Sequence, residues 1–240
     1  MITLIQLKQV ARNRRFLFFT ILFPALWYLM MAKLLNFPRA SANYQLVLLV
    51  LAILIGILGN SIVTFSKRIS SNRRFYFLQA RTSQYSIWNY MGTQLSVQLI
   101  LNLTITVILI ILACLLQTIH FNRVAWLSFV LANVFGVYLS VIGFTFGTSF
   151  ERTAIDAGST PLMFLLATFI VPWKVFLPAN TMVDFMTAIQ KIFPSYYAYQ
   201  MVQQDGQLWK NIGMFATSFV ITLLPFFIAI AAKLLSLIHI

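Results

Sequence analysis

The chain alternates between long apolar runs and short segments that hold most of its polar and charged residues. A helix that spans a lipid bilayer needs about 20 predominantly apolar residues. The pattern therefore predicts six membrane-spanning helices, over residues 16–35, 44–65, 92–118, 124–149, 158–177 and 211–238. Pro172 and Lys174 interrupt the fifth run, and we expect Lys174 to lie at a membrane interface because a charge is costly at the bilayer centre.

The composition excludes a soluble protein. Of the 240 residues, 60% are hydrophobic and 9% are charged, whereas soluble domains carry about 25% charged residues. A soluble fold would have to expose much of this apolar surface to water. We therefore predict an all-α integral membrane protein in which residues 1–240 form a single transmembrane domain. The first apolar run follows Arg12, Arg14 and Arg15 without a signal-peptide cleavage site, so we expect it to be a retained span.

The formal net charge of +13 has a topological interpretation. Six spans place both termini on one side of the membrane, and that side holds eleven of the basic residues: Lys8, Arg12, Arg14, Arg15, Lys67, Arg68, Arg73, Arg74, Arg81, Arg152 and Lys233. The other side holds six: Lys33, Arg39, Arg123, Lys174, Lys191 and Lys210. The positive-inside rule then predicts a cytoplasmic membrane protein with both termini in the cytoplasm. The charge does not require nucleic acid as a partner.

The segment "SKRISSNRRFYFLQARTS", residues 66–83, is the densest basic region and contains no acidic residue. Its five basic residues, Lys67, Arg68, Arg73, Arg74 and Arg81, stand beside Phe75 and Phe77. One interpretation is topological, with the charges held inside against anionic lipid. The other is a short helix at the membrane surface that offers basic and aromatic side chains to a cytosolic protein. These residues alone leave both open.

The third apolar run carries a polar stripe. Gln94, Gln98, Asn102 and Thr106 recur every four residues and therefore share one helix face. Uncharged polar groups in lipid must find partners, so the stripe faces protein or a water-filled path. It either lines a translocation route or forms hydrogen bonds between helices. Asn60 and Asn133 are further buried polar candidates, which we expect to be structural.

The fourth run carries small residues at the same spacing. They are Ala132, Gly136 and Ser140, followed by Gly143 and Gly147. Small side chains let two helices approach closely. The sequence predicts a tight helix interface, either within the subunit or between two copies.

The connection over residues 178–210 predicts a short helical hairpin dipping into the outer leaflet. An apolar stripe at helical spacing precedes Pro194, which we expect to end the helix; it comprises Met182, Phe185, Met186, Ile189 and Phe193. The tyrosines that follow suit the headgroup level of a membrane.

The sequence disfavours catalysis by this chain alone. It contains no G-x-x-x-x-G-K-[ST] motif for nucleotide phosphates. Its acidic residues, Glu151, Asp156, Asp184 and Asp205, lie near span ends or in loops, and no nucleophile–base pair or metal cluster lies within a span. We expect no cofactor bound by this chain.

The layout resembles the membrane subunits of type-2 ATP-binding-cassette (ABC-2) exporters. "LIQLKQVARNRRFLFF" is similar to the cytoplasmic interfacial helix of that family, residues 1–15 here, and the start of its first span. Residues 66–92 sit where the family has a cytoplasmic coupling helix. Residues 147–202 resemble its closing region, with Pro178 and Pro194 matching the prolines of a re-entrant hairpin between spans five and six.

The resemblance implies a half-transporter. Two such subunits, identical or related, would pair with cytosolic ABC ATPase subunits that bind ATP and Mg and hydrolyse the ATP. The residues implied to contact the ATPase are Arg68, Arg73, Arg74, Phe75, Phe77 and Arg81, with Glu151 and Arg152 as a second contact. Gln94, Gln98, Asn102 and Thr106 are the candidates for the translocation path. The expected cargo is hydrophobic or amphipathic: a drug, a peptide or a lipid. The alternative is a non-transporting membrane anchor or sensor whose basic segment binds lipid.

Overall fold

The computed structural model describes residues 17–34, 41–73, 87–203 and 207–238, and within these ranges the regular structure is entirely helical. Its elements are the π-helices η1 (Leu17–Leu22) and η3 (Gly59–Phe65) and the helices α3 (Phe23–Leu34), α4 (Ala42–Leu58), α6 (Ile87–Leu115), α7 (Arg123–Ser149), α8 (Arg152–Ile170), α9 (Trp173–Phe176), α10 (Thr181–Gln190), α11 (Pro194–Gln203) and α12 (Leu208–Ile238). Five helices of the described chain are long and apolar enough to cross a membrane. The prediction of an all-helical fold is therefore confirmed for the described residues, and the five helices are what a multi-pass membrane protein requires.

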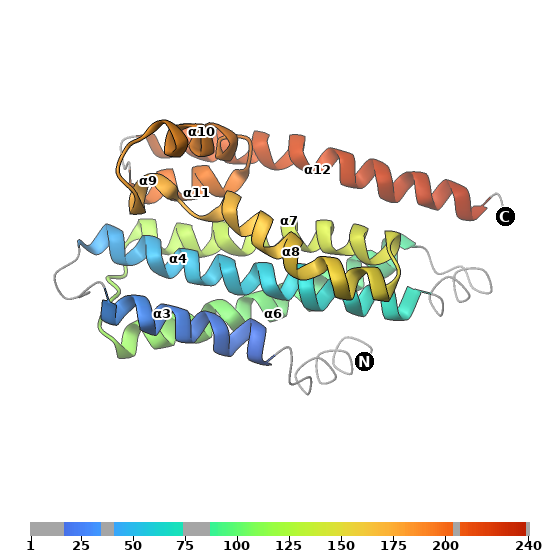
Figure 1. Ribbon diagram of the computed structural model, residues 1–240, viewed down its shortest axis with the longest axis horizontal. Coiled ribbons are helices and arrows are strands. Elements are labelled where there is room, and N and C mark those ends of the chain that lie inside the picture. Colours follow the sequence, from blue (N-terminus) through green and yellow to red (C-terminus); the bar gives the residue numbers. More distant parts are fainter. Residues whose placement is uncertain (1–16, 35–40, 74–86, 204–206, 239–240) are drawn as a thin grey trace.

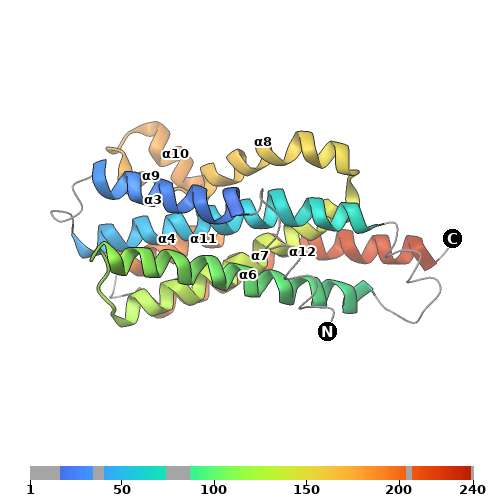
Figure 2. The same ribbon diagram turned by 90° about the horizontal axis from the view of Figure 1, so that it is seen from below.

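The long helices run along one axis of the molecule and alternate in direction (Figures 1 and 2). The C-terminal end of the helix that begins with α4, the N-terminal end of α6 and the α7–α8 junction lie at one end. This end is called the basic end, after Lys67, Arg68, Arg73 and Arg152. The short helices α9, α10 and α11 lie at the other end, called the hairpin end.

Helix α4 forms the centre of the bundle. Ser41 caps its start by accepting a hydrogen bond from the Tyr44 N–H, at 3.4 Å. Thirteen of its 17 residues are buried, as expected for a helix that is apolar on all sides. Helices α3, α6, α7, α8 and α11 pack against α4, so the core is built on it, whereas α12 packs on α7 and α11.

The predicted span limits need correction. The second predicted span ends at residue 65, but the helix continues without a break from Ala42 to Arg73. A polar segment such as 66–73 extends a helix because each added residue gains a backbone hydrogen bond without a new nucleation cost. The fifth span covers Arg152–Ile170 instead of 158–177, and Lys174 lies beyond it on α9.

The other limits differ by up to five residues: the third predicted span, 92–118, is Ile87–Leu115, the fourth, 124–149, is Arg123–Ser149, and the sixth, 211–238, is Leu208–Ile238. The first predicted span, 16–35, corresponds to η1 and α3, and it is not among the five helices that meet the length and hydropathy of a span.

The hairpin end also differs from the prediction. Pro194 opens α11 instead of ending the preceding helix, because a proline at the first helical position loses no hydrogen bond. Helix α10 buries Val183, Thr187 and Gln190. Of the predicted apolar stripe, Met182 is 69% and Phe185 62% exposed, whereas Met186, Ile189 and Phe193 are half-buried.

Candidate functional site

At the basic end, the helix that continues α4 is joined to the α7–α8 junction by polar contacts. Lys67 forms an ion pair with Asp156. The Ser70 hydroxyl donates to the Phe150 carbonyl at 3.0 Å. Arg73 Nη1 donates to the carbonyls of Thr148 at 3.3 Å and Phe150 at 3.5 Å. The last carbonyls of a helix lack partners within it and carry partial negative charge, so Arg73 suits the end of α7. We call these contacts the basic joint.

The structure separates the predicted coupling residues into three groups. Arg73 belongs to the basic joint, while Glu151 precedes α8 and is exposed and Arg152 opens it, 3.9 Å from Asp156. Arg68 instead points into the bundle, where Nη2 lies 3.5 Å from Gln98 Oε1 and the guanidinium lies 5.0 Å from the centre of the Phe65 ring. The remaining candidates lie outside the described residues: Arg74, Phe75, Phe77 and Arg81.

The polar stripe of α6 is buried inside the subunit. Gln94, Gln98, Asn102 and Thr106 are at most 4% exposed. Asn60 Nδ2 donates to Asn102 Oδ1 at 3.0 Å, and Asn133 Nδ2 donates to Thr106 Oγ1 at 3.1 Å. These bonds connect α6 to η3 and α7, as expected of hydrogen bonds between membrane helices. That the stripe lines a translocation route stays a prediction.

A polar cluster is thus formed by Asn60, Gln98, Asn102, Thr106 and Asn133. Within the described residues, four of its buried amide atoms have no hydrogen-bond partner: Asn60 Oδ1, Gln98 Nε2, Asn102 Nδ2 and Asn133 Oδ1. Asn60 stands in η3, a π-helix of seven residues, and π-helical segments occur frequently at functional sites. Since unpaired polar groups are costly in a membrane interior, helix contact alone does not account for the cluster.

The small-residue face of α7 packs against η3 and its continuation. An added Cβ at Gly147 would lie 2.6 Å from both Ile69 Cβ and the Ser66 carbonyl oxygen, and one at Gly143 would overlap the Ser61 carbonyl. Ser61 and Ser140 also hydrogen-bond through their hydroxyls at 3.1 Å. The close approach predicted from the sequence is therefore made within the subunit.

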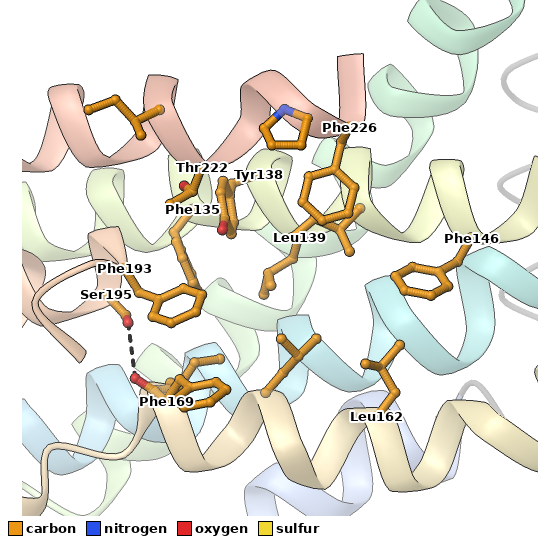
Figure 3. Close-up of a pocket in the computed structure, with 15 residues that line it drawn as sticks. Phe135, Tyr138, Leu139, Phe146, Leu162, Phe169, Phe193, Ser195, Thr222 and Phe226 are labelled. Atoms are coloured by element: carbon orange, nitrogen blue, oxygen red, sulfur yellow. Dashed lines mark hydrogen bonds between the residues drawn. The ribbon is translucent and has the colours of Figure 1, made fainter. Parts of the chain in front are cut away.

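A neighbouring face of α7 borders two cavities that the sequence did not indicate. The larger, about 440 Å³, lies between α7, α8, α11 and α12 (Figure 3). The smaller, about 270 Å³, lies between η3, α7 and α8. Their lining residues are mostly aromatic and aliphatic, and such residues at helical spacing predict a packed core. The space arises from how the helices diverge, which periodicity does not encode.

No protein-family model, curated protein or solved structure matches this chain. In the part of the chain that the structure describes, no three His, Cys, Asp or Glu side chains gather as a metal-binding group. The candidate functional elements are therefore the basic joint, the polar cluster and the two cavities.

Proposed function

We propose that the chain is the membrane-spanning permease subunit of an ATP-driven exporter of the ABC-2 type, which moves a hydrophobic or amphipathic cargo across the cytoplasmic membrane. The observation that carries the proposal is the basic joint. The resemblance assigns ATPase contact to two separate segments, and Arg73 of the first donates to Phe150, which adjoins Glu151 of the second, across 77 positions of sequence. One partner can therefore engage both segments at once.

The joint also offers a route for force. A partner that moves it displaces the ends of two helices together, because Lys67 and Arg73 tie the extension of α4 to the junction of α7 and α8. Arg68, on the same helix, contacts Gln98 of the polar cluster. In the proposed mechanism, closure of the ATPase subunits on ATP shifts the joint, and Arg68 carries that shift to the cluster.

The other assignments follow from the order of the helices along the chain and from the resemblance to ABC-2 exporters. We assign six spans, with η1 and α3 as the first and both termini in the cytoplasm, and α9–α11 as an outer re-entrant hairpin. Residues 1–15 would form the interfacial helix, and the coupling helix would belong to the segment between Arg73 and Ile87; both lie outside the described residues. The partners are a second permease copy or a related permease, membrane lipids and the ATPase, which supplies the bound ATP and Mg and the catalysis.

A second candidate function is a non-transporting membrane anchor or sensor whose basic segment binds anionic lipid. The observation in its favour is that the α6 stripe is buried between helices of the same subunit, as a purely structural stripe would be. The two functions differ in one requirement, since only the exporter needs an ATPase.

The test is affinity purification of the tagged protein from its native membrane in mild detergent, followed by mass spectrometry. We expect an ABC ATPase subunit to copurify. In the double variant Arg73→Glu, Arg74→Glu the ATPase should be lost. Lys191→Glu, an exposed charge reversal at the hairpin end, is the matched control and should retain it.

Each outcome separates the alternatives. Copurification that survives the double reversal would leave the exporter standing and refute docking at the basic joint. If no ATPase copurifies while a known ABC complex from the same membrane stays intact, the anchor or sensor function replaces the exporter.

A further inference from the structure

The two cavities lie end to end along α7 and α8. Phe146 and Leu162 line both of them. In Figure 3 these two side chains lie at one end of the larger cavity, and Phe169, Phe193 and Ser195 lie at the other. The rings of Phe169 and Phe193 stack there, with 4.9 Å between their centres. Phe146 and Leu162 therefore separate two compartments of one longer space, which we call the apolar groove.

The lining of the apolar groove is mostly apolar, and its polar side chains are all hydroxyls: Ser66, Tyr138, Ser159, Ser195 and Thr222. Among the described residues, no charged side chain lines either cavity. The hydroxyl of Ser195 donates to the Phe169 carbonyl at 3.3 Å, and that of Thr222 donates to the Ser218 carbonyl at 2.7 Å. These hydroxyls already donate to the backbone, so a ligand would gain its binding energy from hydrophobic burial.

The groove is long relative to its volume. Along α7 the larger cavity runs from Phe135 to Phe146, a rise of about 16 Å at about 1.5 Å per residue, and the smaller cavity continues beyond Phe146. One leaflet of a bilayer contributes about 15 Å of hydrocarbon. The larger cavity alone, at about 440 Å³, falls within the range of about 300–1,000 Å³ typical of ligand sites. These dimensions suit a flexible linear chain better than a compact molecule.

The mouth of the groove opens on a surface that faces lipid. Ile221, which lines the larger cavity, is 68% exposed. Beside it on α12, Leu224 is apolar and also more than half exposed, and α8 lines the same cavity. Both helices are long and apolar enough to cross a membrane. The molecules at this mouth in a bilayer are therefore acyl chains.

We propose that the apolar groove binds one acyl chain of a membrane phospholipid. This site rests on the proposed function, and it selects lipid from the three classes of cargo. It places the cargo between α7, α8 and α12, away from the α6 stripe. Phe146 and Leu162 divide the groove, so the chain occupies the larger cavity until this pair moves apart.

The test uses the full-length protein in nanodiscs of phosphatidylcholine that carries a photoreactive diazirine on one acyl chain. After irradiation, mass spectrometry maps the labelled residues. Leu139 lines the larger cavity and is 1% exposed, so bulk lipid cannot reach it. We expect label at Leu139. Leu166→Trp, which places an indole in the cavity, should reduce this label about tenfold through lost apolar contact. Leu165→Trp, on the adjacent outward-facing residue, should leave it unchanged.

A second variant keeps the test decisive if Leu166→Trp does not fold. Phe146→Ala removes half of the dividing pair, and label should then extend to Ile155, a buried residue of the smaller cavity. Label confined to outward-facing residues such as Leu224 in the wild type would refute the proposal. Label at Leu139 from a photoreactive fatty acid but not from the phospholipid would also refute it, and would assign the groove to a free amphiphile.

The two proposals fail separately. Groove labelling requires no ATPase, so labelled Leu139 without a copurifying ATPase would sustain the lipid site and refute the exporter. An ATPase lost on reversal of Arg73 and Arg74, together with an unlabelled groove, would sustain the exporter and refute the lipid site.

Discussion

The two faces of α7 are packed in opposite ways. On one face Gly136, Gly143 and Gly147 bring its backbone against η3 and α6 so closely that an added methyl group has no room. On the other face Phe135 and Phe146, with larger side chains, border open space. Of the helices that pack on each face, the helix Ala42–Arg73 is 89% buried over its most apolar part, and α12 is 22% buried. We call the closely packed half on the glycine face the rigid half, and the half that borders the cavities the adaptable half.

The largest effect should come from filling the glycine face. In Gly143→Ala the new Cβ overlaps the Ser61 carbonyl, a backbone atom that cannot rotate away. We expect the free energy of unfolding to fall by about 3 kcal/mol or more. Gly213→Ala on α12, where nothing lies within 4 Å of the new Cβ, should be neutral or stabilise by up to about 1 kcal/mol. Unfolding in mixed micelles with increasing SDS measures both. Equal losses in the two variants would contradict the division of α7.

The next prediction adds the same three carbon atoms to each face. Ala132→Leu enlarges a residue on the glycine face, and Ile142→Phe enlarges one that lines the larger cavity; the two residues are 1% and 4% exposed. Ala132→Leu should cost about 1–3 kcal/mol, whereas Ile142→Phe should change stability by less than about 1 kcal/mol because the ring enters the cavity. The same unfolding titration measures both changes. A larger loss in Ile142→Phe would show that the cavity face is as closely packed as the glycine face.

The rigid half was largely predictable from the sequence, and the adaptable half was not. Glycine spacing and the four-residue recurrence of Gln94 to Thr106 are local properties of one helix, so they indicate a close-packed and a polar face before any partner is known. Which residue each side chain contacts cannot be read from one helix, since contacting residues such as Lys67 and Asp156 lie 89 positions apart in the sequence. The second span was predicted to end at residue 65 because the polarity of residues 66–73 outweighed the tendency of a formed helix to continue. The apolar groove depends on where α7, α8, α11 and α12 diverge. The inward position of Gln190 on α10, where it donates to the Thr168 carbonyl at 3.2 Å, is likewise a contact between distant segments that local spacing does not encode.

A smaller effect should show whether the amides of Asn60 and Asn102 stabilise each other or are only buried side by side in the rigid half. Asn60 and Asn102 share one hydrogen bond of 3.0 Å. In a double-mutant cycle with Asn60→Ala and Asn102→Ala, we expect a coupling energy of about 0.6 kcal/mol, the average for bonds between membrane helices. Each single variant should lose more than this, because it also removes packing. A coupling near zero would mean that the two amides are held by the surrounding helices and do not stabilise each other.

The smallest effect belongs to the adaptable half, where α9 meets α10. Lys174 Nζ lies 2.8 Å from Asp184 Oδ1, and both side chains are more than half exposed. The hydrogen bond from Lys174 to Asp184, and then the charge of that carboxylate, raise the pKa of Lys174 above its ordinary value. The raised pKa means that the pair stabilises the fold while Lys174 is protonated in both states, below about pH 10. Its contribution is lost as the pH rises through the folded-state pKa, and solvent screening keeps it small.

Asp184→Asn is the variant that isolates this contribution. Its melting temperature should lie slightly below that of the wild type at pH 8, and the gap should close as the pH rises above the ordinary range of lysine. Thermal unfolding of both proteins across that range measures the gap. A gap that persists at high pH would assign the contact to a hydrogen bond that survives deprotonation of Lys174. The contact between α9 and α10 would then depend on hydrogen-bond geometry and not on charge. Only the apolar groove would then remain as the adaptable part of the subunit.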